Sequence, residues 1–176
     1  MKKTVIALIS IILSLATLIS LVSCDEDVPE GYVKYEEYGF TYMLPEEMDK
    51  KTVSYAAICH SNREATLMVD YFDAESLEEM EIDSNITIKR YADKFLLLND
   101  YDDTVYTYDE ERDRVYFFAE KTFDEGEVTE ESVLYYHLLM RNDYVVYIVT
   151  LYCDVSLKEK YTPIFLEWAD RMSILK

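Results

Sequence analysis

The chain has 176 residues, of which half are apolar and 30 % are charged, so its composition is that of a folded domain rather than a disordered segment. It carries 36 acidic and 17 basic side chains, a net charge of −19. This balance argues against a nucleic-acid partner, because such binding depends on Lys and Arg neutralising phosphates. We expect a solvated, acidic surface, with a cationic partner or weak calcium binding as the alternative.

The first 24 residues are arranged as a secretory signal. Two lysines follow Met1, residues 4–23 carry no charge, and small residues precede Cys24. The stretch Leu21-Val-Ser-Cys24 resembles the lipobox of bacterial lipoproteins. The resemblance implies cleavage before Cys24 and attachment of lipid to its thiol, so that the protein is anchored to the cell membrane and faces outside the cytoplasm. The alternatives are an uncleaved spanning helix and an ordinary signal peptide with a chance cysteine.

These signals divide the chain into three parts. We expect a lipoprotein signal peptide over residues 1–23, an acidic tether over 24–31 and a single domain over 32–176. Cleavage would remove two lysines and shift the net charge from −19 to −21. At about 0.8 kcal/mol per buried CH₂ group, two acyl chains hold a protein firmly on a bilayer. The expected partners are the membrane, through the lipid on Cys24, and an envelope protein.

The first part of the domain has the alternating pattern of strands. A turn at Glu37-Tyr-Gly39 separates the first two, Pro45 ends the second, and a polar turn at 61–63 precedes the fourth. The predicted strands are 32–36, 39–43, 51–60 and 65–73.

A helix is predicted next, over residues 77–98. Ser76 and Glu79 have the spacing of a capping box, in which each side chain bonds the backbone of the other. The residues Asp83-Ser-Asn85 can interrupt this helix. The apolar stripe is clearest after them, at Ile88, Tyr91, Ala92, Phe95 and Leu96.

Alternation returns after Tyr101. The predicted strands are 104–109, 114–123, 132–140 and 144–153, and the last is apolar enough to be central and covered on both faces. A second capping box, Ser156 to Glu159, predicts a closing helix with one apolar stripe. Pro163 is awkward inside it, so Thr162 is expected to cap the main helix, with 172–176 as a tail.

Runs of hairpin-linked strands with two helices predict an α+β fold. The stretch Tyr35-Glu-Glu-Tyr-Gly-Phe-Thr-Tyr-Met-Leu-Pro45 resembles the opening of PsbP-like domains, and the closing helix with Tyr161, Phe165 and Ser173 is similar to theirs. The resemblance implies an αβα sandwich around a central antiparallel sheet across residues 32–176. Relatives range from extrinsic photosystem subunits to Ran-binding nuclear proteins and bacterial lipoproteins, so no functional residue is carried over.

The remaining cysteines, Cys59 and Cys153, lie in apolar strands. They can form a disulfide outside the cell, or they can remain as buried thiols. With His60 and His137 they include ligand types that zinc accepts, but no ligand spacing is present, so we expect no metal site and two partly exposed imidazoles.

No motif for catalysis is present in the sequence. There is no Gly-x-Ser-x-Gly elbow, and the three glycines cannot form a phosphate loop. The acidic stretches 100–103 and 124–127 do not match a calcium loop and are expected to be turns. We therefore expect no enzyme and no cofactor, but a non-catalytic accessory or protein-binding domain. The alternative is a small-ligand or cation-binding lipoprotein, which predicts an enclosed pocket of roughly 300 Å³ or more.

Overall fold

Long strands with alternating apolar residues build a seven-stranded antiparallel sheet. The computed structural model describes residues 28–101, 103–123 and 131–175, and the fold is that of the unit over residues 31–176. In spatial order the strands are β3 (Asp49–Lys50), β4 (Ile58–Ser61), β5 (Ala65–Asp73), β9 (Val145–Asp154), β8 (Glu131–Arg141), β7 (Arg114–Phe123) and β6 (Thr107–Asp109).

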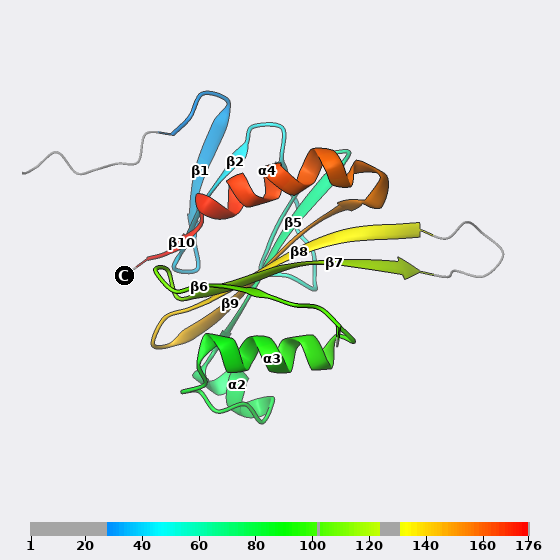
Figure 1. The fold of residues 1–176 in the computed structure, drawn as a ribbon. Coiled ribbons are helices and arrows are strands. Elements are labelled where there is room, and N and C mark those ends of the chain that lie inside the picture. The colour runs from blue at the N-terminus through cyan, green and yellow to red at the C-terminus, as the bar shows by residue number, and fades with distance from the viewer. Residues whose placement is uncertain (1–27, 102, 124–130, 176) are drawn as a thin grey trace, which may run out of the picture. The chain divides into compact units, whose positions relative to one another are not determined.

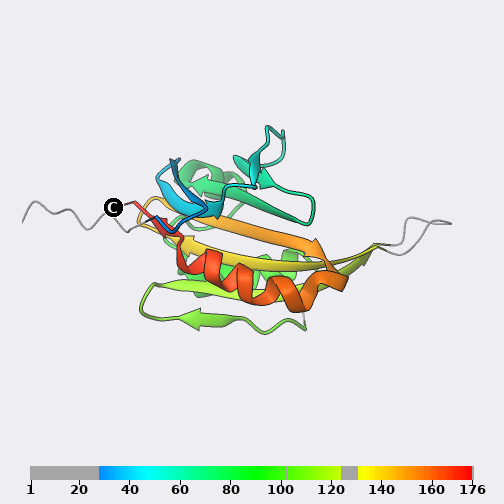
Figure 2. The same cartoon turned by 90° about the horizontal axis from the view of Figure 1, so that it is seen from above.

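Both faces of this sheet are covered (Figure 1). Helices α2 (Ala74–Glu79) and α3 (Ile88–Leu98) cover one face. The other face carries α4 (Lys158–Asp170) and a three-stranded sheet of β1 (Tyr32–Glu37), β2 (Phe40–Pro45) and β10 (Ser173–Ile174). Figure 2 shows the β1–β2 hairpin and α4 side by side on that face. The predicted α+β sandwich is confirmed.

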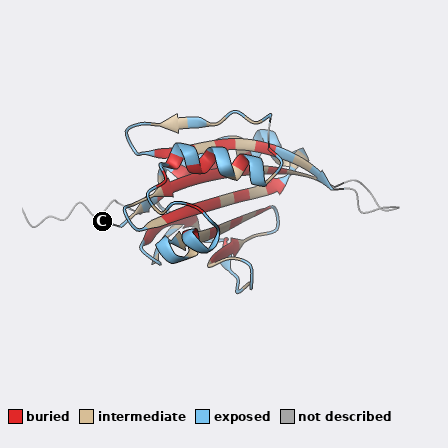
Figure 3. Cartoon of the chain, turned by 90° about the horizontal axis from the view of Figure 1, so that it is seen from below, coloured by how far each residue is buried: buried red, intermediate tan, exposed pale blue. Residues whose placement is uncertain are grey.

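Strand β9 occupies the middle of the sheet, between β5 and β8. Val149, Leu151 and Cys153 belong to the core beneath α4, whereas Val146 and Ile148 belong to the core beneath α3. The prediction of a central strand covered on both faces is therefore confirmed, and Figure 3 shows the buried residues running along the central strands.

The β1–β2 hairpin is fastened to β9 at its tight turn. Tyr38 and Gly39 have φ values of 53° and 74°, as a two-residue turn matching the twist of a hairpin requires. The Tyr147 hydroxyl donates to the Tyr38 carbonyl oxygen at 2.7 Å. A Cβ on Gly39 would lie 3.0 Å from that hydroxyl, so the glycine serves both the turn and its contact.

Of the predicted strand 104–109, only β6 forms. Two further segments differ from the prediction. Residues 51–57 are not strand: only β4 of the predicted strand 51–60 forms, although Lys51 N–H donates to the Cys59 carbonyl at 2.8 Å. The predicted tail contains β10, which pairs with β2, because Ile174 packs against the core beneath α4. Neither difference is visible locally, since both depend on neighbours distant in sequence.

Both predicted capping boxes are wrong, although the predicted break in the first helix is confirmed by the gap between α2 and α3. Asp73 caps α2, and its carboxylate accepts from Ser76 N–H at 2.9 Å. Asp154 accepts from Ser156 N–H at 2.8 Å and caps a 3₁₀ turn over Val155–Leu157 that leads into α4. In each case an aspartate at a strand end satisfies the first amide groups instead of the serine.

Helix α4 runs through Pro163 without ending, contrary to the predicted start at Thr162. The Thr162 hydroxyl instead donates to the Lys158 carbonyl oxygen at 2.8 Å, within the first turns of the helix. In the described parts of the chain, no helix has the length and apolar character needed to cross a membrane.

Candidate functional site

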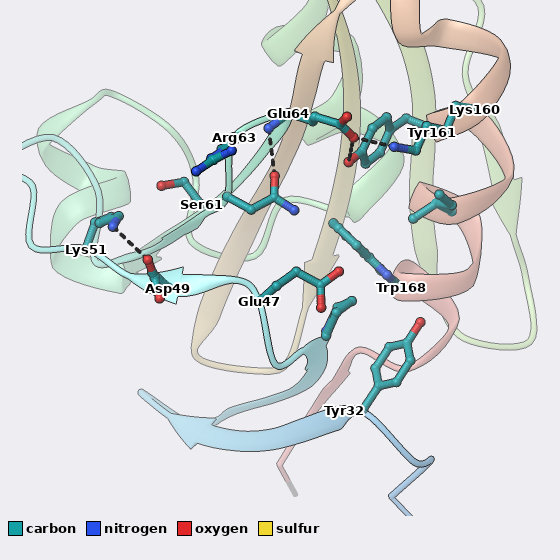
Figure 4. A pocket seen from close by; sticks show the side chains of 13 residues that line it. Tyr32, Glu47, Asp49, Lys51, Ser61, Arg63, Glu64, Lys160, Tyr161 and Trp168 are labelled. Carbon is teal, nitrogen blue, oxygen red and sulfur yellow. Dashed lines mark hydrogen bonds and ion pairs between the residues drawn. The ribbon is translucent and has the colours of Figure 1, made fainter.

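A groove of about 780 Å³, open to solvent, runs between α4 and the turn that joins β4 to β5. In Figure 4, Tyr161 and Trp168 project into it from α4, Arg63 and Glu64 come from the turn, and Tyr32 and Glu47 lie at one end. The lining residues are Tyr32, Pro45, Glu47, Asp49, Lys51, Ser61, Asn62, Arg63, Glu64, Lys160, Tyr161, Ile164 and Trp168.

The β4–β5 turn is shaped by one asparagine. The Asn62 side-chain oxygen accepts from the N–H groups of Glu64 and Ala65, both at 2.8 Å, and Asn62 N–H donates to the Ala65 carbonyl at 3.0 Å. Such local bonds hold a tight turn without help from the rest of the fold. They fix Arg63 and Glu64 at the edge of the groove.

Glu64 is bound to α4 by two neighbours. Its Oε2 atom accepts from the Tyr161 hydroxyl at 2.9 Å and from the Lys160 ammonium. The hydrogen bonds from Lys160 and Tyr161 lower the pKa of Glu64, so this carboxyl group is ionised at neutral pH. Burial, together with the bond to Glu64, raises the pKa of Tyr161 to about 12. Glu64 Oε1 makes no hydrogen bond to a described residue and remains an acceptor.

The other end of the groove is formed around Tyr32. Its hydroxyl donates to Glu167 at 3.1 Å, and the Arg171 guanidinium lies 4.6 Å from the centre of its ring. Trp168 is 3 % exposed, and its Nε1 lies on the side of the indole toward Tyr32 (Figure 4). This N–H makes no hydrogen bond of standard geometry to any described residue, and the Tyr32 hydroxyl is the polar group beside it.

The charges lining the groove balance one another. Lys51 pairs with Asp49 at 3.3 Å, and Lys160 pairs with Glu64. Arg63 and Glu47 form no side-chain hydrogen bond or ion pair with the residues described. The groove is therefore locally neutral on a chain whose net charge is −19, and it offers hydrogen-bond donors, acceptors and apolar surface.

The cysteines and histidines singled out in the sequence are not brought together. Strand register places Cys59 and His137 on the face toward α3, and His60 and Cys153 on the face toward α4. Cys59 and Cys153 are free thiols on opposite faces of strands separated by β5, so the disulfide alternative does not occur in this structure. Cys24 and residues 124–127 lie outside the described residues, as does Asp102.

Both histidines are buried in the core, which corrects the expectation of partly exposed imidazoles. His60 is fully buried between the Tyr42 hydroxyl at 3.0 Å and the Met48 carbonyl at 3.2 Å. His137 contacts the hydroxyls of Tyr101 at 3.2 Å and Thr150 at 3.1 Å. Burial lowers the pKa of both imidazoles, that of His137 to about 3.

The buried His137 predicts a loss of stability in acid. Its folded-state pKa of about 3 lies below the unfolded value, so stability is complete above pH 6.5 and is lost as pH falls from 6.5 toward 3. We expect His137 alone to remove about 1.4 kcal/mol per pH unit in that range. Urea unfolding at pH 7, 6 and 5 measures the slope, and His137→Gln should make it shallower. An unchanged slope would contradict this assignment.

Comparison with known proteins identifies the fold. No protein-family model matches the chain, and no curated protein sequence matches it. Among solved structures, it is similar to cyanobacterial PsbP (CyanoP) from Synechocystis sp. PCC 6803, at a TM-score of 0.55 and 15 % identity, covering 88 % of this chain and 99 % of that one. The fold is PsbP-like.

The PsbP-like fold is shared with a second solved protein. The Ran-binding protein Mog1p of Saccharomyces cerevisiae is similar at a TM-score of 0.54 and 10 % identity, covering 82 % of this chain and 96 % of that one. At such identities the likeness concerns the fold alone, and the predicted PsbP-like domain is supported to that extent.

The groove itself was missed by the sequence analysis. Tyr161 and Trp168 were assigned to the apolar stripe of the closing helix, and both are indeed buried. No sequence motif singles out Glu64, Lys160 or Tyr32. A usable signal was the single tryptophan on the helix, since a buried indole N–H needs an acceptor.

Proposed function

We propose that this PsbP-like chain is a non-catalytic accessory or binding domain, lipid-anchored through Cys24 on the outer side of a cell membrane, and that the groove beside α4 is its binding site. The observation that carries the proposal is the groove, which holds a buried donor without a partner, Trp168 Nε1. Ligand sites combine apolar walls with a few such polar groups.

A non-catalytic role is supported by where the reactive side chains lie. Both described thiols and both imidazoles are buried in the core, and none of the four lines the groove. Burial raises the pKa of Cys59 and raises that of Cys153 to about 11, which disfavours the nucleophilic thiolate. Burial likewise lowers the pKa of each histidine, which weakens it as a base at neutral pH.

The proposed anchor limits the reach of the domain. Strand β1 begins at Tyr32, eight residues after Cys24. A chain of eight residues spans at most about 29 Å when fully extended. The groove would therefore meet partners in or next to the membrane.

The small-ligand alternative is less well supported. It requires an enclosed pocket, whereas the groove is open to solvent along α4. An open groove beside a helix accommodates a segment of a larger partner, which favours the accessory or protein-binding role.

Replacing Cys24 should remove the lipid. Cells fed an alkyne analogue of palmitate should label the wild-type protein, whereas Cys24→Ala should be unlabelled, with at least a tenfold loss of signal in a gel assay. Cys59→Ala is the matched control and should keep the label, because Cys59 is buried in the sheet. Equal labelling of Cys24→Ala would refute the anchor.

The binding role is tested by capture from cross-linked envelopes. The wild-type protein should recover one envelope complex, and Ile164→Lys, which places a charge in the groove, should lose it. Leu166→Lys is the matched control on the same helix, because Leu166 is 37 % exposed and does not line the groove. Recovery that is the same for both variants would show that the groove is not the binding site.

A further inference from the structure

We propose that the groove beside α4 recognises the backbone of a short, extended peptide segment of a partner protein. This inference rests on the proposed binding role of the groove and names the chemistry of its ligand.

The first reason is the indole of Trp168. Its N–H is buried and has no acceptor among the described residues. Buried donors are nearly always paired in folded proteins, because an unpaired one forfeits its bond to water. Trp168 lines the groove beside the Tyr32 hydroxyl, so a ligand that displaces this hydroxyl can reach the N–H and supply the missing acceptor. A peptide carbonyl oxygen is such an acceptor.

The second reason is that the walls offer complementary groups. Glu64 Oε1 and the Glu47 carboxylate make no hydrogen bond to a described residue and can accept from peptide N–H groups. Arg63, also without a bond to a described residue, can donate to a second carbonyl. A peptide backbone carries one donor and one acceptor at nearly every residue, which matches a groove that presents both.

The third reason is the charge of the groove. Three basic and three acidic side chains line it, so neither a strongly anionic ligand nor a polycation is favoured. Pro45 and Ile164 add apolar surface on which a peptide side chain can pack.

An oligosaccharide fits the groove less well. Sugars pack on the open faces of aromatic rings, but Tyr161 and Trp168 are almost completely buried. One face of the Tyr32 ring is already occupied by Arg171. The aromatic side chains thus offer no open ring face on which a sugar can stack.

The chain has a built-in reporter for this site, because Trp168 is its only tryptophan. The full chain, labelled with ¹⁵N and held in detergent micelles, should show a single indole N–H resonance. The probes are a positional-scanning library of hexapeptides blocked at both ends and a panel of chito-, cello- and malto-hexaose. We expect particular peptide pools to move the indole proton downfield, as a new hydrogen bond does, and the sugars to leave it unchanged.

Variants then separate recognition from general binding. Trp168→Phe keeps a ring but removes the donor, and should weaken binding of the best peptide about 3- to 10-fold, as expected for one neutral hydrogen bond. Ile164→Lys should weaken it at least tenfold, and Leu166→Lys should bind like the wild type. Because Trp168→Phe lacks the reporter, affinities are measured by anisotropy of a fluorescent peptide, and thermal unfolding checks that each variant is folded.

The outcomes distinguish this inference from the proposed function. Sugars that shift the indole while all peptide pools leave it unchanged would overturn the peptide inference and leave the binding role intact. Peptides that bind Trp168→Phe as tightly as the wild type would also overturn it. If neither probe moves the indole although an envelope complex depends on Ile164, the groove binds a folded surface and the peptide inference fails.

Discussion

Replacing Phe165 by alanine is expected to lower the free energy of unfolding by about 3–5 kcal/mol. Phe165 is 0 % exposed and lies in the core that joins α4 to the sheet. Its ring centre is 5.3 Å from that of Tyr161 and 5.8 Å from that of Trp168. Alanine would leave a cavity that these large neighbours cannot fill by small shifts. Urea unfolding at pH 7 measures the change.

Leu166→Ala provides the control for Phe165, because it shortens the next residue of the same helix on its exposed side. It should cost less than about 1 kcal/mol, as surface substitutions generally do. Phe165→Ala should also disturb the groove, since Tyr161 and Trp168 hold their positions by packing on this ring. A loss for Phe165→Ala no greater than that for Leu166→Ala would mean that α4 does not depend on this core.

Replacing Arg114 by alanine is expected to cost about 3 kcal/mol, because it removes three hydrogen bonds from a buried guanidinium at about 1 kcal/mol each. The Arg114 side chain is 6 % exposed. It donates from Nε to Asp109 at 2.9 Å, from Nη2 to Asp170 at 2.8 Å and from Nη1 to the Ala169 carbonyl at 2.9 Å. These bonds connect β7 with β6 and with the last turn of α4, and urea unfolding would report their loss.

Arg112 is the natural comparison for Arg114. It also pairs with Asp170, at 2.9 Å, but its side chain is 51 % exposed. Arg112→Ala should therefore change the free energy of unfolding by no more than about 1 kcal/mol. Arg114→Lys, which keeps the charge but cannot make all three bonds, should fall between the two. Equal losses of unfolding free energy for Arg112→Ala and Arg114→Ala would contradict the view that burial makes the Arg114 hydrogen bonds the more stabilising.

The hydrogen bonds of Arg114 should also affect how the free energy of unfolding depends on pH. Its hydrogen bond lowers the pKa of the Asp170 carboxyl. Because the folded pKa lies below the unfolded one, the stability contributed by Asp170 is present above the unfolded value and is lost as pH falls through the folded one. The wild-type protein and Arg114→Ala should thus become more similar in stability at acid pH.

The sequence was most informative where the spacing of apolar and polar residues alone determines the secondary structure. The apolar run of β9 predicted a central strand because every residue along it is apolar or aromatic except Thr150 and the final Asp154. The break between α2 and α3 followed from three polar residues in succession. The helix starts were less accurate, because an aspartate at the end of the preceding strand competes with serine for the same amide groups, as at Asp73.

The groove is formed by residues that lie close together in space but far apart in the sequence, so no local sequence pattern predicts it. The Tyr32 hydroxyl bonds Glu167, which is 135 residues away, and the Tyr161 hydroxyl bonds Glu64, which is 97 residues away. The stripe of α4 correctly predicted that Tyr161 and Trp168 are buried. It could not show that the β4–β5 turn stops short of the helix and leaves a space between them.

The pairing of β10 with β2 bears on how such a chain folds while it is synthesised. Ile174 lies opposite Phe40, and Ser173 opposite Thr41, so the small sheet is completed only by the last strand of the domain. A ribosome delivers these two partners far apart in time. We expect the domain to stay open during synthesis, since its closing strand is the last to arrive. The small sheet would then be completed only after the whole domain has left the ribosome.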